Sequence, residues 1–133
     1  MPLQNRKINP WTWQDQFGVS QAIETTGHSR VVRCAGQASL NENGEPVHVG
    51  DMPAQVAKAL DNLETVLKAA NMTLANVVRL NIYTTDVDKY MESYDAAQSR
   101  LDAANCRPAV TFLGVSRLAF PGLMVELEAT AVA

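Results

Sequence analysis

One apolar stripe between residues 51 and 71 constrains the fold of this chain more than any other feature. Apolar side chains recur there at alternating spacings of four and three: Val56, Leu60, Leu63, Leu67 and Ala70. This spacing predicts a helix with one face turned to a core. Asp51 is a good N-cap, Pro53 needs no backbone donor in the first turn, and Asn71 is suited to end the helix. The helix must therefore cover one face of another element.

A strand pattern follows this helix, over residues 77–84. One face of this strand carries three apolar residues: Val78, Leu80 and Ile82. The other face carries three larger polar or amphipathic residues: Arg79, Asn81 and Tyr83. Alternation of this kind is typical of a strand with one face on a core. The second face is too polar for a hydrophobic core, and its side chains are too bulky for a surface that contacts nothing but solvent. A subunit interface is therefore expected to cover it.

A second helix is predicted between Asp86 and Asn105. Asp86 can cap it, and Pro108 cannot continue it. Apolar or aromatic residues again recur three and four positions apart: Val87, Tyr90, Tyr94, Ala97, Leu101 and Ala104. Like the first helix, this one needs a surface to cover.

Four more strands are predicted from β-branched residues and turn signals. They are residues 19–26, 30–37, 109–116 and 123–132. The first two flank Gly27-His28-Ser29 and are interpreted as a hairpin. The last two flank a turn at residues 119–122, which contains Pro121-Gly122.

The order of elements is therefore strand, strand, helix, strand, helix, strand, strand. This ββαβαββ order predicts an α+β fold, a mixed sheet with both helices on one face. A length of 133 residues fits a single domain, residues 1–133, of which residues 1–16 form an N-terminal segment.

The charge balance argues against nucleic acid as a partner. Eleven Lys and Arg stand against 14 Asp and Glu, which gives a net charge of −3, and no basic stripe is present to neutralise a phosphate backbone. No apolar run approaches the roughly 18 residues of a membrane span, so no membrane contact is expected. The first residues lack an apolar leader pattern, and a cytoplasmic location is expected.

Cysteine and histidine give no support for a metal site. Cys34 and Cys106 are the two cysteines, neither belongs to a CxxC motif, and we interpret both as inert, packed thiols. His28 and His48 lie in predicted loops and are interpreted as solvated. No P-loop, Gly-rich dinucleotide motif or Ser-His-Asp arrangement can be assembled from the sequence.

Several segments match one family in order and spacing. They are Ala35-Gly36-Gln37, Ala59-Leu60-Asp61-Asn62-Leu63, Val77-Val78, Tyr83-Thr84-Thr85-Asp86, Pro108-Ala109 and Val125-Glu126-Leu127-Glu128-Ala129. From about residue 17 to residue 132 the chain resembles the RidA family of reactive intermediate deaminases, also called YjgF-like proteins. The resemblance implies a chorismate-mutase-like fold and a homotrimer with clefts between subunits. It also implies hydrolysis of enamines and imines to 2-keto acids and ammonia without a cofactor.

The resemblance assigns two site residues directly. In active members a glutamate positions and deprotonates the attacking water, and backbone groups near a Gly-Gln turn hold the imine. These correspond to Glu126 and Gly36, with Ala35 where the family usually has serine. From the residues alone, Glu126 and Glu128 are two solvated charges on one face of an edge strand, and Gly36 marks a bulge. The resemblance favours the catalytic interpretation for Glu126.

The chain departs from the family at the arginine that clamps the substrate carboxylate. Deaminating members carry Pro-Ala-Arg-Ser where this chain has Pro108-Ala109-Val110-Thr111. The clamp position is therefore Val110, and valine cannot bind a carboxylate. Arg107 lies three residues earlier, which reverses the face of a strand unless a bulge intervenes. Ser20 stands where members often have tyrosine, and Phe112 and Tyr83 complete the expected substrate-side residues.

Two other features have alternative interpretations. Arg33 lies on a strand of otherwise small and apolar residues, where an unpaired charge is costly. It either reaches the rim of the cleft or, as we prefer, pairs with Glu24 across the hairpin. The aromatic residues Trp11, Trp13 and Phe17 either line the mouth of the pocket or, as we prefer, pack on a neighbouring subunit.

Two functions remain open. One is a cofactor-free hydrolase for an enamine or imine other than a simple 2-imino acid, which the retained Glu126 favours. The other is a non-catalytic trimer that binds a small metabolite or acts as a chaperone, which the loss of the clamp favours. The endoribonuclease activity that the family is also labelled with would need a basic RNA-binding surface, and the acidic charge balance argues against it.

Overall fold

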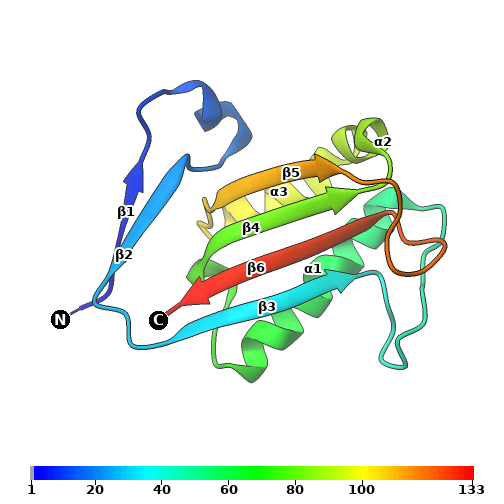
Figure 1. Ribbon diagram of the computed structural model, residues 1–133, viewed down its shortest axis with the longest axis horizontal. Coiled ribbons are helices and arrows are strands. Elements are labelled where there is room, and N and C mark those ends of the chain that lie inside the picture. Colours follow the sequence, from blue (N-terminus) through cyan, green and yellow to red (C-terminus); the bar gives the residue numbers. More distant parts are fainter. Residues whose placement is uncertain (1) are drawn as a thin grey trace.

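The computed structural model describes residues 2–133 and shows a sheet with helices packed on one of its faces (Figure 1). The sheet has four strands: β3 (Val31–Ala38), β4 (Val77–Thr84), β5 (Ala109–Gly114) and β6 (Val125–Val132). Their order is β3-β6-β4-β5. β6 runs antiparallel to both of its neighbours, whereas β4 and β5 are parallel. The prediction of an α+β fold with a mixed sheet is confirmed.

The long helix α1 (Met52–Ala69) forms where the apolar stripe predicts it. The Asp51 carboxylate accepts a hydrogen bond of 3.1 Å from the backbone N–H of Ala54, which satisfies one of the free donors of the first turn. At the other end Asn71 has a left-handed φ of 57°. Both predicted boundaries are confirmed to within two residues.

The second predicted helix is divided into α2 (Val87–Glu92) and α3 (Tyr94–Ala103). Asp86 caps α2 by accepting from the Lys89 N–H at 3.0 Å, as predicted. The division falls at Ser93, whose φ of −102° and ψ of 13° leave the helical range. The Ser93 backbone N–H still donates to the Lys89 and Tyr90 carbonyls, at 3.2 and 2.9 Å, so the chain bends there without losing this hydrogen bond. Among the described residues, no helix has the combination of length and apolar character that crossing a bilayer requires.

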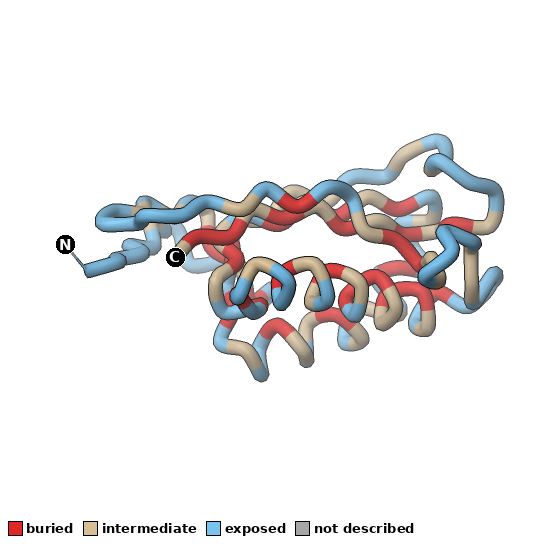
Figure 2. The backbone as a smooth tube through the Cα atoms, turned by 90° about the horizontal axis from the view of Figure 1, so that it is seen from below, coloured by how far each residue is buried: buried red, intermediate tan, exposed pale blue. Residues whose placement is uncertain are grey.

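The core lies between the sheet and the helices, which all cover the same face (Figure 2). From α1 the fully buried leucines are Leu60, Leu63 and Leu67. From the sheet, Leu80 on β4 and Leu127 on β6 face them from the opposite layer and are at most 2% exposed. Each such side chain contributes about 1.5–3 kcal/mol by burial. The stripe that predicts the helix is thus also its contact surface.

The predicted hairpin between residues 19–26 and 30–37 is wrong. β2 (Ala22–Thr26) pairs with β1 (Gln4–Ile8), a strand that was not predicted, and the two form a separate antiparallel sheet. The chain after Gly27 is held by the backbone N–H groups of Ser29 and Arg30, which donate to the Ala133 carbonyl at 2.9 and 3.0 Å. These bonds lead β3 along β6, and β2 pairs with β1 rather than with the outer edge of β3.

Candidate active site

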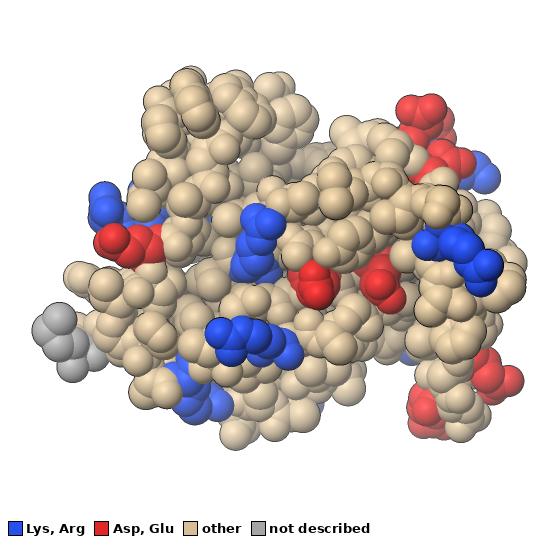
Figure 3. Space-filling view, in the orientation of Figure 1, with Lys and Arg blue, Asp and Glu red and all other residues tan. Residues whose placement is uncertain are grey.

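The two carboxylates predicted to share a face of the last strand lie on the face of the sheet that no helix covers. Figure 3 looks onto this open face and shows acidic groups near its middle with basic groups beside them. Glu126 is opposite Tyr83 and Glu128 is opposite Asn81 in the register of β6 with β4. The polar face of β4 and the carboxylates of β6 therefore form one surface.

Glu128 is held by two hydrogen bonds across the strands. The Tyr83 hydroxyl donates to Glu128 Oε1 at 2.9 Å, and the Asn81 side-chain amide donates to the same oxygen at 2.8 Å. Both bonds favour the ionised carboxylate and so lower the pKa of Glu128, the bond from Asn81 having the larger effect and that from Tyr83 the smaller. The same contact raises the pKa of Tyr83. Glu128 is therefore a fixed, charged group of this face.

Replacing Tyr83 by phenylalanine is expected to raise the pKa of Glu128 toward its ordinary value, because one donor to the carboxylate is lost. Because the pKa of Glu128 is lower in the folded state than in the unfolded state, its ionisation stabilises the fold at pH values above the unfolded-state pKa of about 4.3. This stabilisation is lost as the pH falls through the lower folded-state pKa. Tyr83→Phe should therefore reduce the Glu128 contribution to stability above that range. Carbon-13 NMR titration of the glutamate carboxyls measures the shift, with Tyr94→Phe as the matched control. An unchanged Glu128 pKa in Tyr83→Phe would contradict the assignment.

Glu126 lies directly against the backbone of Gly36. The register of β3 on β6 shifts between Cys34 and Gln37, so Gly36 lies in a bulge. A Cβ atom at Gly36 would be 2.6 Å from Glu126 Cδ and 2.9 Å from Oε2, closer than real side chains approach. Among the described residues, Glu126 accepts no hydrogen bond from another side chain, unlike Glu128. The absence of a side chain at Gly36 thus places a free carboxylate against exposed backbone.

Val110 and Phe112 lie on the other face of the sheet. In the parallel register of β5 with β4, Val110 is opposite Leu80 and Phe112 is opposite Ile82. Leu80 and Ile82 face the helices, so the clamp position and Phe112 face them as well. Within one chain, the structure therefore does not bring Val110 together with Glu126.

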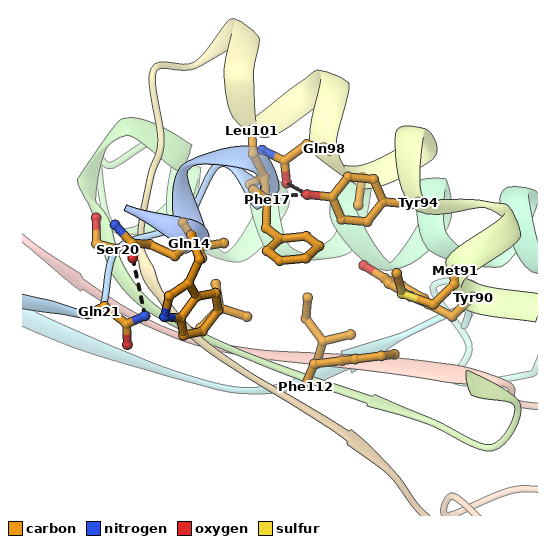
Figure 4. A pocket seen from close by; sticks show the side chains of 15 residues that line it. Gln14, Phe17, Ser20, Gln21, Tyr90, Met91, Tyr94, Gln98, Leu101 and Phe112 are labelled. Carbon is orange, nitrogen blue, oxygen red and sulfur yellow. Dashed lines mark hydrogen bonds between the residues drawn. The ribbon is translucent and has the colours of Figure 1, made fainter. Parts of the chain in front are cut away.

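Val110, Phe112 and Ser20 line a pocket of about 360 Å³. The pocket lies between the 3-10 helix η1 (Trp13–Phe17), the helices α2 and α3, and the strands β4 and β5, as Figure 4 shows from close by. The Ser20 hydroxyl donates to the Arg107 carbonyl at 2.6 Å, and the Ser20 N–H donates to the Pro108 carbonyl at 3.0 Å. These bonds fix the segment after η1 beside the start of β5.

Several pocket residues were not identified from the sequence. The tyrosines of the second helix, Tyr90 and Tyr94, had the spacing of core residues, yet both line the pocket. From η1, Trp13 and Phe17 line it too, which agrees with the alternative that aromatic residues surround the pocket mouth. Trp11 is 59% exposed. The signal that could have identified η1 is the density of aromatic side chains at residues 11–17.

The predicted ion pair between Arg33 and Glu24 is wrong. Glu24 pairs instead with Arg6 at 3.1 Å, across the unpredicted pairing of β1 with β2. Arg33 is exposed and lies opposite Thr130 of β6, on the same open face as the carboxylates. Arg107 is exposed next to the start of β5, and its carbonyl rather than its side chain contacts the pocket residue Ser20.

Both cysteines are buried and free, as predicted. Burial raises the pKa of Cys34, and it raises that of Cys106 to about 11, so neither is an activated thiolate at neutral pH. His28 and His48 are exposed. No cluster of potential metal ligands occurs within residues 2–133.

Comparison with known proteins places the chain in one family. Residues 17–133 match the family model described as endoribonuclease L-PSP. A RutC family protein from Aquifex aeolicus is 30% identical over 114 residues, which cover 85% of this chain and 86% of the relative.

Solved structures agree with this result over nearly the whole chain. A Rid-family protein of unknown function, YyfB from Yersinia pestis, is 37% identical with a TM-score of 0.83, covering 97% of this chain and 98% of its own. A member of the YjgF/YER057c/UK114 family from Mycobacterium tuberculosis is 29% identical with a TM-score of 0.66, covering 98% of this chain and all, 100%, of its own. The similarity thus includes the N-terminal segment that precedes the family match.

Proposed function

The chain belongs to the RidA (YjgF-like) family, and from this we propose that it binds a small enamine or imine and hydrolyses it without a cofactor. The substrate differs from the simple 2-imino acids that arginine-bearing members accept, because Val110 occupies the clamp position. The site is a cleft between copies of the chain in a homotrimer.

The contact between Glu126 and the Gly36 backbone carries this proposal. A free carboxylate beside exposed N–H and C=O groups can bind water and a polar C=N group at the same time. Glu126 takes a proton from the water as the water oxygen bonds to the imine carbon, and it returns this proton to the nitrogen, which gives a carbinolamine. The hydroxyl proton of the carbinolamine then passes through Glu126 to the nitrogen, the C–N bond breaks, ammonia leaves, and a carbonyl product remains. Water and imine are thus converted to ketone and ammonia with no other reactant.

Assembly from several copies is supported by the placement of the site residues. Glu126 and Val110 lie on opposite faces of one sheet, and Gly36 and Val110 lie on its two edge strands, β3 and β5. A second copy placed against an edge can bring these groups together where one chain cannot. The Asn81 side-chain oxygen on the open face is buried and finds no hydrogen-bond donor within the described residues. A donor from a neighbouring copy would satisfy it.

We expect light scattering to give a mass of about three times the 14.5 kDa of one chain. The physical reason is the polar and aromatic face around Tyr83, which a neighbouring copy would cover. Measurement at micromolar concentration is sufficient. A mass of one subunit under these conditions would remove the intersubunit cleft.

Little ammonia release is expected from 2-iminopropanoate. A charged hydrogen-bonding contact to the substrate is worth about 1.5–3 kcal/mol, so its loss lowers the rate by roughly 10- to 200-fold. The assay generates 2-iminopropanoate in place and compares this chain with an arginine-bearing family member, and an uncharged imine is run in parallel. A rate on 2-iminopropanoate equal to that of the arginine-bearing protein would show that another group binds the carboxylate.

The alternative function is binding without catalysis, including chaperone-like binding. The observation that favours it is the apolar surrounding of Val110, which leaves no cation for the usual substrate. A folded trimer that releases no ammonia from charged or uncharged imines would establish this alternative over hydrolysis. RNA cleavage is not proposed, because the net charge of −3 disfavours binding to a phosphate backbone.

A further inference from the structure

The pocket beside η1 is built by one chain and lies on the opposite face of the sheet from Glu126. Its floor is formed by Ile82, Val110 and Phe112, and the helices α2 and α3 form the facing wall. In Figure 4 the labelled aromatic side chains from η1, the helices and β5 surround one open space. Val110, Phe112 and Ser20 are also the substrate-side residues of the proposed function, so this inference rests on that function and names the class of molecule that the site takes.

The pocket carries no charge. None of the residues that line it is Asp, Glu, Lys or Arg. Burial is the first cause that raises the pKa of Tyr90, to about 12, and that of Tyr94, so both hydroxyls stay neutral at physiological pH. An anion entering this pocket would lose hydration without gaining a counter-charge. The electrostatics therefore select neutral ligands.

Most polar groups of the pocket are already bonded within the chain. The Tyr94 hydroxyl donates to the Phe17 carbonyl at 2.5 Å, and the Gln98 amide donates to Asp102 at 2.8 Å. Gln14 is the exception, because it is 1% exposed and its carboxamide makes only two long hydrogen bonds, of 3.3 and 3.4 Å. A hydrogen bond from the polar group of a ligand to Gln14 can replace one of these long hydrogen bonds.

The rim presents apolar surface to solvent. Trp13 is 56% exposed, Met91 45% and Phe17 38%. The Trp13 and Phe17 rings meet edge to face, with centroids 6.5 Å apart and an interplanar angle of 75°. Aromatic rims of this kind gain free energy when a planar apolar molecule covers them.

We propose that this pocket is a binding site for a neutral, mainly apolar molecule of one or two rings that carries a single polar group. The volume of about 360 Å³ is near the lower end of the range for small-molecule sites, which sets the size. The uncharged walls set the charge, and Gln14 is the group that contacts the polar end of the ligand.

Two probes of equal shape and different charge test the proposal: naphthalene-2-carboxamide, which is neutral, and 2-naphthoate, which is an anion. Trp11 and Trp13 are the two tryptophans of the chain. In a Trp11→Phe background, intrinsic fluorescence reports on Trp13 at the pocket rim alone. The carboxamide is expected to bind at least about tenfold more tightly than the naphthoate, a difference of about 1.4 kcal/mol.

Val110→Arg should reverse this preference, because it introduces a cation into the floor of the pocket. The matched control is Val49→Arg, the same exchange at a 65% exposed loop position outside the pocket, which should leave the preference unchanged. If Val110→Arg does not fold, methyl NMR of the unsubstituted chain gives an independent test. The carboxamide should then shift the Val110 and Ala97 methyl signals and leave those of Val31 unchanged.

Three results would overturn the proposal. They are no binding of the carboxamide at millimolar concentration, equal binding of the two probes, and the same preference in folded Val110→Arg as in the unsubstituted chain. Because binding rather than ammonia release is measured, these results are distinguishable from a failure of hydrolysis at Glu126, which would leave the preference between the two probes unchanged.

Discussion

Replacing Glu126 by glutamine is expected to lower ammonia release from the best uncharged imine by about 100-fold or more. Glutamine keeps the size of the side chain and its contact with Gly36 but cannot accept the proton of the attacking water. General base catalysis by a positioned carboxylate contributes about 10²- to 10⁴-fold, so its loss should dominate the rate. Steady-state kinetics should show the loss in kcat, with KM changed much less.

Glu128→Gln is the matched control for this experiment. Glu128 lies two residues away on the same face, but its carboxylate is already engaged by Tyr83 and Asn81. Its loss should lower stability at neutral pH, where the ionised carboxylate contributes, rather than slow the chemical step. Trimer mass and circular dichroism are checked first for both variants. Full activity of Glu126→Gln, or an equal loss in Glu128→Gln, would contradict the role assigned to Glu126.

Val110→Arg is expected to give measurable hydrolysis of 2-iminopropanoate, with a gain of roughly 10- to 200-fold from the restored carboxylate contact. The added substitution Glu126→Gln should abolish the gain, because orientation by arginine and water activation by glutamate are both required. The exchange carries a stability risk, since a cation in an apolar pocket must reach water or a partner. Folding and mass are therefore measured before activity.

Mixing chains distinguishes an intersubunit site from a site within one chain. The unsubstituted chain lacks the arginine, and the double variant Val110→Arg/Glu126→Gln lacks the glutamate, so each alone should be inactive on 2-iminopropanoate. After denaturation and joint refolding, a cleft between copies would combine Arg from one chain with Glu126 from another, and activity should appear. No activity in the mixture, with activity in Val110→Arg alone, would place the site within one chain.

The parts of the fold that the sequence predicts are those with regular apolar periodicity. Leu60, Leu63 and Leu67 identify α1 because burial on one face imposes a spacing that the chain displays. The alternation over residues 77–84 identifies β4 for the same reason. By contrast, β1 was missed because four of its five residues are exposed and so have no pattern to show. Strand pairing was the other failure, since the sequence does not display which strands share an edge.

The candidate site was predictable in composition and not in arrangement. The spacing of Glu126 and Glu128 correctly places both on one face, but their strand is an inner strand and not the edge strand suggested by the residues alone. Gly36 is found in a bulge, which was the alternative interpretation of this glycine. That Val110 faces the helices follows from its register with Leu80, which no local pattern encodes. The pocket combines four consecutive elements, β4, α2, α3 and β5, with η1 from near the start of the chain. Its aromatic rim could be suspected from residues 11–17, but its walls could only be seen in three dimensions.

The central position of β6 has a consequence for synthesis. β6 is the last of the strands along the chain, yet it lies between β3 and β4. β3 and β4 do not pair with each other, and each pairs with β6. During translation the apolar faces of α1 and β4 are therefore made before the strand that completes their sheet. Contacts between distant segments form slowly, and the partly made sheet exposes unpaired edges in the interval. We expect the nascent chain to depend on chaperones until β6 has emerged from the ribosome.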